Sequence, residues 1–420
     1  MLVLLAVLAA QARAHAVPAD VGFIFYDAGE TLGLRPVIEQ LAANGTRCNV
    51  LCCTDNAAQL MSSLRSYPGI HVVPLQHELN RSVPLQRNDT LSARQLQALL
   101  RGYPVRFGSA QVVVTGAVSA VQQQLAMALH RGNHSHVVAF DDGFGRWDTS
   151  SRVASMANSG SAHELIVTAD GIAKAARAAA PLPLLPYGVR ALGSPSLEAW
   201  RGESTYLNTT AALALRAAVM RQFEPSAGSS GQGASSDGDD VLLLFFGGYG
   251  GADYNATIEE LGRFALRAAA LSPRVRVALT QHPGQGVERN VEHAVLARVH
   301  AGGTVAVLPP TTQFSSSAVA AVANVTASED STCGVQSLFI GVPSMYIQPP
   351  CCPGAPHIYG GNVAVDADLL PVAGNASAAF DLLGGFDDVK YHFDAARLAD
   401  AGVPLHATAN VVARLTSILA

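Results

Sequence analysis

"VGFIFYDAGETLGLRPVIEQLAANGTRCNVLCC", residues 21–53, places one helical segment between two short apolar runs. The first run, 21–26, is rich in the β-branched and aromatic residues that favour strands. Residues 31–45 carry apolar side chains at helical spacing and end at a glycine, and 47–53 form a second apolar run. A strand, a helix and a strand in this order are typical of a parallel sheet.

The same alternation continues along the chain. Further strand-like runs occur at 70–75, 110–116, 136–142, 164–169, 240–248, 274–282, 304–310, 325–330 and 342–347, with helical patterns between most of them. Apolar strands alternating with helices predict a sheet covered on both faces. We therefore expect an α/β protein with two Rossmann-like domains whose parallel sheets face a central cleft, where open α/β sheets bind ligands.

One segment, residues 224–240, is rich in Gly, Ser and Asp and has almost nothing to bury. Such a composition predicts a flexible linker. We expect an N-terminal domain at 17–223 and a C-terminal domain at 241–420. The closing segment, 396–420, has a helical pattern that could pack back across the domains.

The first sixteen residues form an apolar run followed by small residues suited to a cleavage site. This pattern predicts a signal peptide at 1–16, although the usual basic residues before the apolar run are missing. The alternative is a buried first strand or helix. No other apolar run reaches the length that would span a bilayer, so we expect no transmembrane anchor.

Glycosylation triplets support the secretory prediction. Eight of the fourteen asparagines begin an N-x-[ST] triplet, whereas composition alone predicts roughly two. The chain is therefore expected in the lumen of the secretory pathway or outside the cell, with these acceptors on its surface: Asn44, Asn80, Asn88, Asn133, Asn208, Asn255, Asn324 and Asn375.

Composition limits the possible partners. Charged residues make up 14% of the chain and the net charge is −5, which gives no reason to expect nucleic acid as a partner. Six cysteines fit an oxidising compartment and predict disulfide bonds, with fifteen complete pairings left open.

The turn at 329–334 is the first candidate binding segment. Ser331 or Thr332 caps a helix that follows a strand, and the free amides of a helix start favour a phosphate. Gly334 would let a ligand approach the backbone. The alternative is an ordinary cap with no ligand.

Two other strand ends in the second half carry polar turns. The glycine-rich loop after the strand at 240–248 includes Gly248 and Gly250, whose amides could cradle a phosphate. His282 follows the strand at 274–280, although a lone histidine is usually a packed or solvated residue. We expect these turns to bind a ligand that carries phosphate.

Acidic turns mark the first half. Asp27 and Glu30 follow the first strand, and Glu30 could act as general base towards a hydroxyl or could simply favour a helix start. Asp141 and Asp142 could bind sugar hydroxyls, with Trp147 or Phe144 stacking on the ring, or could form a plain surface turn.

Metal and cofactor binding are not expected. His130, His134 and His136 lie close together, but Asn133 among them is a glycan acceptor. We predict neither a metal site nor a cofactor.

These motifs resemble the two-domain GT-B glycosyltransferases, and most closely the branch with lipid A disaccharide synthase, KDO transferase and UDP-N-acetylglucosamine 2-epimerase. "DAGETLGLRPVIEQL" is similar to the G-E turn of the first two groups, which implies that Glu30 lies at the active site. "QHPGQ" resembles the H-P turn of the epimerases, matching His282. "EDSTCGVQSLFIGVPSMYI" resembles their D-S-G-G-x-Q-E-E helix followed by G-x-P-V, which implies that Ser331 to Gly334 and Gln336 bind a donor diphosphate.

The sequence also departs from this branch. Ser337 and Leu338 stand where the epimerase helix has paired glutamates, which argues against epimerase chemistry. Thr332 and Cys333 precede Gly334 where the family has a second glycine. No nucleobase-specific motif is visible.

The resulting hypothesis is a glycosyltransferase-like enzyme that moves a sugar from a nucleotide-sugar, most simply a UDP-sugar, to a carbohydrate or lipid-linked hydroxyl. The domain at 17–223 would be the acceptor side, with Glu30 as catalytic base and no metal. The domain at 241–420 would be the nucleotide-sugar side, with the turns at Gly248, Gly250 and His282 binding the donor. Two alternatives stay open: a nucleotide-sugar epimerase or hydrolase, and a non-catalytic carbohydrate-binding protein.

Overall fold

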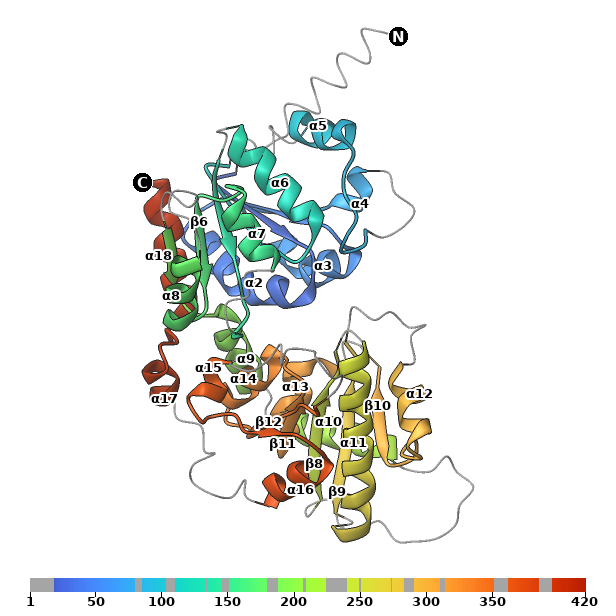
Figure 1. Ribbon diagram of the computed structural model, residues 1–420. Coiled ribbons are helices and arrows are strands. Elements are labelled where there is room, and N and C mark those ends of the chain that lie inside the picture. Colours follow the sequence, from blue (N-terminus) through green and yellow to red (C-terminus); the bar gives the residue numbers. More distant parts are fainter. Residues whose placement is uncertain are drawn as a thin grey trace, which may run out of the picture. The chain divides into compact units, whose positions relative to one another are not determined.

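The structure is a computed structural model of the chain. It describes residues 19–79, 85–102, 110–132, 135–145, 151–179, 188–206, 209–223, 240–248, 251–272, 274–282, 291–309, 314–350, 362–384 and 395–420. The described residues form two compact units, each built on a parallel sheet with helices packed against it (Figure 1). The predicted pair of parallel-sheet α/β domains is thereby confirmed.

Unit 1 contains a seven-stranded sheet in the order β3-β2-β1-β4-β5-β6-β7. Its strands are β1 (Val21–Phe25), β2 (Cys48–Cys52), β3 (Ile70–Pro74), β4 (Val112–Thr115), β5 (His136–Phe140), β6 (Glu164–Val167) and β7 (Gly188–Ala191). The helices around it are α2 (Ala28–Ala43), α3 (Asp55–Leu60), α4 (Leu75–Glu78), α5 (Ala93–Gly102), α6 (Ala120–Arg131), α7 (Arg152–Asn158), α8 (Asp170–Ala179), α9 (Pro195–Tyr206, shared with unit 2) and α18 (Ala407–Leu419).

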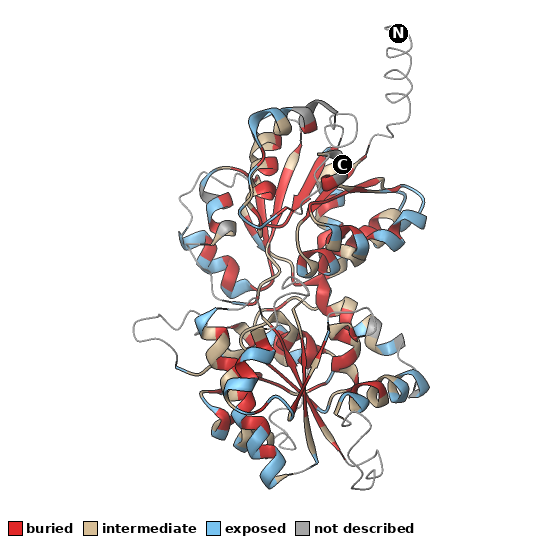
Figure 2. Ribbon diagram, turned by 90° about the vertical axis from the view of Figure 1, so that its right-hand side faces the viewer, coloured by how far each residue is buried: buried red, intermediate tan, exposed pale blue. Residues whose placement is uncertain are grey.

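The apolar residues of β1 and α2 form the core at the centre of unit 1. Every residue of β1 is buried, as expected for a parallel strand covered on both faces. Figure 2 shows the strands of both sheets as mostly buried and the helices around them as carrying exposed faces. Helix α2 buries one stripe at the spacing of a 3.6-residue turn: Leu34, Val37, Ile38 and Leu41.

Unit 2 contains a six-stranded sheet in the order β10-β9-β8-β11-β12-β13. Its strands are β8 (Val241–Phe246), β9 (Val275–Thr280), β10 (Val305–Leu308), β11 (Val325–Ser328), β12 (Ser344–Ile347) and β13 (Val372–Ala373). Its helices are α10 (Thr209–Met220), α11 (Ala252–Leu271), α12 (Val291–Arg298), α13 (Ser316–Val322), α14 (Thr332–Phe339), α15 (Val363–Asp366), α16 (Ala376–Gly384) and α17 (Ala395–Asp400).

The two units do not divide the chain where the sequence pattern placed the boundary. Unit 1 takes residues 1–143, 147–199 and 402–420, and unit 2 takes 144–146 and 200–401. Residues 200–223 join unit 2 because Trp200 and Val219 pack in one apolar cluster with Leu242 and Phe246 of β8. The expected linker at 224–240 lies outside the described residues except for Asp240.

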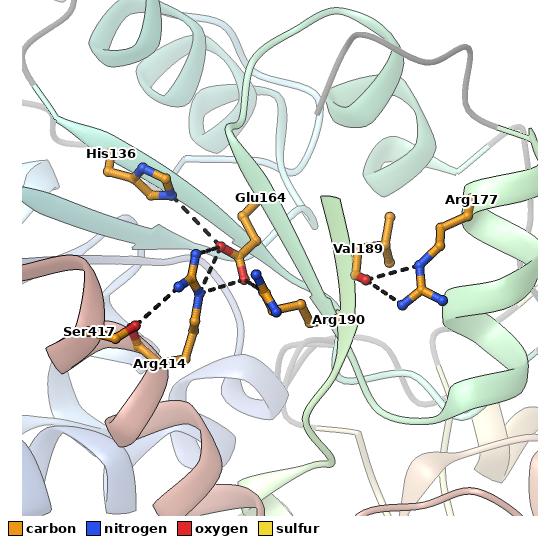
Figure 3. A network of polar contacts seen from close by, with 7 residues as sticks. All are labelled: His136, Glu164, Arg177, Val189, Arg190, Arg414 and Ser417. Carbon is orange, nitrogen blue, oxygen red and sulfur yellow. Dashed lines mark hydrogen bonds and ion pairs between the residues drawn. The ribbon is translucent and has the colours of Figure 1, made fainter. Parts of the chain in front are cut away.

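Helix α18 returns to unit 1 at the end of the chain, as its helical pattern allowed. Val411, Val412 and Leu415 join the apolar cluster that contains β1 and α2. On its other side Arg414 donates two hydrogen bonds of 3.0 Å and one of 2.6 Å to the buried carboxylate of Glu164 (Figure 3). Arg190 contacts the same carboxylate at 2.7 Å.

These contacts also set the ionisation of Glu164. Burial raises the pKa of this carboxyl, but hydrogen bonds from His136 and Arg414 and the nearby arginine charges outweigh burial and hold the pKa below its usual range. The carboxylate is therefore charged at neutral pH and fastens α18 to β6.

In the part of the chain described here, no helix is both long enough and apolar enough to cross a membrane.

Candidate functional site

Polar side chains gather at the carboxyl edge of the unit 1 sheet, where β1 leads into α2. Asp27 is the N-cap of α2, and its Oδ1 accepts a 3.1 Å hydrogen bond from the Glu30 amide. The Glu30 carboxyl accepts from the Asp27 amide at 3.3 Å, so the two residues form a capping box. Of the two roles left open for Glu30, the helix-start role is present in the structure.

The Glu30 carboxyl is also buried, with 2% of the residue exposed. Its Oε1 accepts a 2.7 Å bond from Nε2 of Gln122 and another from the Tyr26 amide. Its Oε2 contacts no hydrogen-bond donor among the described residues. Burial, with the negative charges of Asp27 and Asp142, raises the pKa of Glu30 well above its usual range, so the protonated form is favoured.

Asp142 lies beside this turn, in the segment that follows β5. Gly29 is exposed, and a Cβ placed on it would lie 3.2 Å from Oδ2 of Asp142 and 3.6 Å from Oδ1 of Asp27. The two carboxyl groups therefore face the same point above Gly29. Burial first, then the charges of Asp27 and Asp141, raises the pKa of Asp142 to about 7, which is a value suited to proton transfer near neutral pH.

The neighbouring residues of this acidic segment differ in exposure. Asp141 is half-buried, its Oδ1 accepts from the Gly143 amide at 3.1 Å, and burial raises its pKa. Phe144 is 1% exposed and belongs to unit 2, so it offers no face on which a sugar ring could stack. Trp147 lies outside the described residues.

Three turns meet at the carboxyl edge of the unit 2 sheet. A Cβ on Gly247, after β8, would lie 3.2 Å from the His282 amide, after β9. A Cβ on Gly248 would lie 3.6 Å from Oε2 of Glu329, after β11. The β8 turn therefore lies against both of its neighbours, and glycine is needed at position 247 because the Thr280 carbonyl is only 2.6 Å from the same Cβ position. Gly250 lies outside the described residues.

Helix α14 begins at this edge with the predicted cap. Ser331 has extended backbone angles, and its Oγ accepts a 3.2 Å hydrogen bond from the Cys333 amide. Ser331 and Thr332 are half-buried. The first amides of α14 therefore lie at the strand ends, and the positive end of the helix dipole makes the position favourable for an anion.

Gly334 has a packing role in place of the predicted approach of a ligand. It is buried, and a Cβ on it would lie 3.0 Å from Cε1 of Tyr346 and 3.2 Å from both Cδ1 of Leu370 and Oγ of Ser344. The absence of a side chain lets α14 rest on β12. Gln336, with 7% exposed, is likewise buried.

His282 lies at the end of β9 in a half-buried position. Burial lowers its pKa to about 4, and the Glu292 carboxylate opposes that change only in part. Glu292 is itself buried and accepts a 2.8 Å bond from the Tyr254 hydroxyl and a 3.2 Å bond from Gln281. His282 is thus a neutral imidazole at physiological pH and adds hydrogen-bonding capacity without charge.

Glu329 and Asp330 were not among the predicted site residues. Burial, followed by the charges of Asp330 and Asp253, raises the pKa of Glu329 to about 7. Burial raises the pKa of Asp330 to about 6. Their position between a buried strand and a helix cap was the available sequence signal, because such a turn lies at the same sheet edge as the glycine loop.

Two of the histidines considered for metal binding, His130 and His136, each lie against the ring of His163. The ring centroids of His130 and His163 are 4.0 Å apart, and those of His136 and His163 are 4.8 Å apart. His134 lies outside the described residues, and no group of three or more His, Cys, Asp or Glu side chains within the described ranges could hold a metal ion.

The four cysteines within the described ranges are not in disulfide bonds. Cys48, Cys52 and Cys53 are buried free thiols, and Cys333 is a half-buried one. Burial raises the pKa of Cys48 and of Cys52 to about 12, so these thiols are unreactive. The disulfides expected from the cysteine count are not seen, and the other two cysteines, 351 and 352, lie outside the described residues.

Five of the glycosylation triplets lie within the described residues. Asn44, Asn88, Asn324 and Asn375 are exposed, as expected for acceptors, whereas Asn255 is half-buried in α11 with a buried Oδ1. The acceptors that lie outside the described residues are Asn80, Asn133 and Asn208.

Comparison with known proteins identifies the fold. No protein-family model matches the chain, and no curated protein matches it in sequence. Solved structures do match over nearly the whole length. UDP-GlcNAc 2-epimerase from Neisseria meningitidis, bound to UDP-GlcNAc, has a TM-score of 0.64 at 13% identity and covers 94% of this chain and 99% of its own.

Two further structures give the same result. S. aureus MnaA in complex with UDP has a TM-score of 0.63 at 12% identity, covering 95% of this chain and 96% of its own. A glycosyltransferase from Rickettsia africae has a TM-score of 0.57 at 8% identity, covering 95% and 98%. At these identities the likeness establishes a GT-B fold shared with epimerases and glycosyltransferases.

Proposed function

We propose that this chain is a nucleotide-sugar-binding protein of the secretory pathway that transfers the sugar to a hydroxyl acceptor. The observation that carries the proposal is the meeting of three turns at the carboxyl edge of the unit 2 sheet. There the start of α14 lies with the Gly247–Gly248 turn and His282. Backbone amides at a helix start and in a glycine turn are suited to a diphosphate.

The structural neighbours support this choice of ligand. The N. meningitidis structure contains UDP-GlcNAc and the S. aureus structure contains UDP. In the present chain, the donor would lie with its diphosphate against the amides that follow Ser331. Neutral His282 would donate or accept a hydrogen bond there. The proposal includes a relation to the lipid A synthase and KDO transferase branch. The turn that resembles the G-E motif of this branch is the one in which Glu30 forms its capping box with Asp27.

Unit 1 supplies the groups for proton transfer in this proposal. Asp142 is half-buried, faces the exposed Gly29 and has a pKa of about 7, whereas Glu30 lies deeper and favours its protonated form. We infer that the ionised Asp142, with Asp27 beside it, takes the proton of the acceptor hydroxyl, while the buried Glu30 positions this turn through its capping box with Asp27. In a transfer step the acceptor oxygen attacks the anomeric carbon, its proton goes to the carboxylate, and the nucleoside diphosphate leaves with the bonding electrons.

An epimerase or hydrolase is the second candidate, and the neighbours favour it equally because several of them are UDP-GlcNAc 2-epimerases. Against it stand Ser337 and Leu338 on α14, which replace the paired glutamates. Ser337 is fully buried with its Oγ bonded to the Cys333 carbonyl at 2.8 Å, and Leu338 is in the core. A carbohydrate-binding protein without turnover is the third candidate.

The deciding experiment separates binding from chemistry. A thermal-shift screen of the purified chain against nucleotides and nucleotide-sugars detects the donor, because ligand at 100 times its Kd stabilises a protein by about 2.7 kcal/mol. Thr332→Glu should abolish that shift by repelling the phosphate, while the matched exchange Thr205→Glu, at an exposed position in the last turn of α9, should keep it.

Product analysis then distinguishes the three candidates. A transferase releases the nucleoside diphosphate slowly without acceptor, an epimerase returns an isomeric nucleotide-sugar, and a binding protein leaves the ligand unchanged. Glu30→Gln and Asp142→Asn should each lower turnover by roughly 10²–10⁴-fold while donor affinity stays near that of the parent. No ligand-induced shift with any nucleotide would disprove the proposal.

A further inference from the structure

Acidic side chains lie at the carboxyl edge of the unit 2 sheet, where the nucleotide is proposed to bind. Negative charge is unusual at a site that binds an anion. Glu329 and Asp330 directly precede the Ser331 cap of α14, and Asp253 lies in the first turn of α11. No ion pair to Glu329 or Asp330 is present within the described ranges. His282 at the same edge is neutral above pH 5, because burial lowers its pKa to about 4.

Glu329 occupies a fixed place within this edge. Its Oε2 lies 3.6 Å from the Cβ position of Gly248, and its carbonyl accepts a 2.9 Å hydrogen bond from Gln348, after β12. The Glu329 carboxyl therefore lies beside the glycine turn, and its residue stands two positions before the Ser331 cap of α14, where the diphosphate of the proposed donor would bind. Ser328, one residue earlier, has a fully buried hydroxyl that contacts no partner among the described residues.

An anion placed here meets two opposing effects. The amides and dipole of α14 favour a negative charge. Two ionised carboxylates within a few ångströms of a phosphate disfavour it strongly, because like charges in a partly buried site are weakly screened. The conflict disappears when the carboxyl groups are protonated, and burial already favours that form, raising the pKa of Glu329 to about 7 and of Asp330 to about 6.

We infer that Glu329 and Asp330 are specificity-determining residues of the proposed nucleotide site, which binds its diphosphate together with protons taken up by these two carboxyl groups. The inference rests on the proposed function. Each proton passes from buffer to a carboxylate oxygen as the nucleotide enters and returns to buffer as it leaves. The site therefore holds a nucleotide-sugar tightly in an acidic compartment and releases it as pH rises.

The other ionisable groups around the pair do not mimic this behaviour. Those whose charges act on the two carboxyl groups, or on which these groups act, are Asp253 and Tyr254 of α11 and Tyr346 of β12. Burial raises the pKa of both tyrosines far above the physiological range. Asp253 carries the same sign of charge as the pair and strengthens the requirement for protons.

Calorimetry of the full chain with UDP-GlcNAc tests the inference. Both phosphates of this probe are esterified, so its own charge stays constant across the range studied. We expect Kd to be nearly flat below about pH 5.5 and to rise about tenfold per pH unit for each proton taken up once pH exceeds the pKa of the free carboxyl groups. Titrations at pH 7.5 in two buffers of different ionisation enthalpy should count nearly two protons taken up, because both carboxyl groups are mostly ionised at this pH before the nucleotide binds.

Variants identify the groups responsible. Glu329→Gln should bind UDP-GlcNAc at pH 8 about tenfold more tightly than the parent and should lose about half of the proton uptake, because Asp330 remains. Glu259→Gln removes the same charge from the exposed face of α11, where Glu259 pairs with Arg263 and Arg298, and should behave as the parent.

Two failures have separate meanings. Binding with a Kd independent of pH and without proton uptake would overturn the inference and leave the proposed function standing. The absence of UDP-GlcNAc binding by parent and Glu329→Gln at every pH would overturn the proposed nucleotide site and the inference with it.

Discussion

Gly116 leaves open the space that the carboxyl group of Glu30 fills. A Cβ on Gly116 would lie 2.5 Å from Cδ of Glu30 and 3.0 Å from Nε2 of Gln122. The buried carboxyl, its hydrogen bond to Gln122 and the capping box of α2 therefore depend on one glycine at the end of β4.

Gly116→Ala should destabilise unit 1 by about 1–3 kcal/mol, because the added methyl group forces the Glu30 carboxyl out of its place. Urea unfolding followed by far-UV circular dichroism measures the change. Gly171→Ala in α8 is the control, since a Cβ there meets nothing within 4 Å and alanine is the better helix former. Equal stability of parent and Gly116→Ala would show that Glu30 has room to move.

Gly334→Ala should destabilise unit 2 while Gly384→Ala should not. The first Cβ meets Tyr346 at 3.0 Å and separates α14 from β12, whereas the second meets nothing within 4 Å. We expect a loss of about 1–3 kcal/mol for Gly334→Ala, measured as a lower midpoint of thermal unfolding. An unchanged midpoint combined with weakened nucleotide binding would restore the ligand-facing role of Gly334.

Arg414→Met should weaken the attachment of α18 to unit 1. It leaves the buried Glu164 carboxylate with fewer partners, and removing one partner of a buried ion pair costs about 3–5 kcal/mol. Arg263→Met is the control, because its pairs with Glu259 and Glu260 are on the surface and contribute less than about 1 kcal/mol. Limited proteolysis should cut the Arg414→Met chain near 402 before the parent is cut.

The ion pair between Glu164 and Arg414 predicts that the stability of the protein depends on pH. The folded pKa of Glu164 is lowered, so its stabilisation is complete above the unfolded pKa of about 4.3 and is lost as pH falls through the folded value. Relative to its own stability at pH 7, the parent should therefore lose more stability on acidification, and begin to unfold at higher pH, than a Glu164→Gln, Arg414→Met double variant that lacks this carboxylate. Coincident acid transitions would exclude this role for Glu164.

Glycan occupancy should differ among the acceptors if the chain passes through the secretory lumen. We expect glycans on the exposed Asn44, Asn88, Asn324 and Asn375, and none on Asn255, whose Oδ1 is buried in α11. Peptide mapping after enzymatic deglycosylation in heavy-oxygen water reads each site. An unmodified chain from secreting eukaryotic cells would argue against the predicted localisation.

The fold was predictable because parallel strands buried on both faces leave long apolar runs. Residues 21–26 were expected as a strand and 21–25 form β1, and residues 342–347 were expected and 344–347 form β12. The caps were also readable, since Asp27 and Ser331 both stand directly before an apolar helical pattern. Local chemistry determines these features, so a local pattern reveals them.

The remaining features depend on contacts between distant parts of the chain. Gly334 looks like a ligand-facing glycine until Tyr346 and Leu370 are placed beside it. In the sequence, Glu30 fits a base at the end of a strand. Its burial becomes visible only when Gly116 and Gln122, which are distant in sequence, are placed beside it. The sequence pattern does not reveal the boundary between the two units near residue 200. A Gly/Ser-rich composition indicates only where the chain is flexible, whereas the packing of Trp200 against Phe246 assigns residue 200 to unit 2.

The return of the chain to unit 1 sets an order of events during synthesis. Val411, Val412 and Leu415 complete the cluster that contains Val21 and Phe23, yet they leave the ribosome last. At about 5–20 residues per second, roughly ten to forty seconds separate the last residues of unit 1 before Trp200 from this final helix. Unit 2 has all its strands by then, so the second half of the protein can finish folding first. The nascent first half meanwhile carries an uncovered apolar face, and this interval is where a chaperone would be needed.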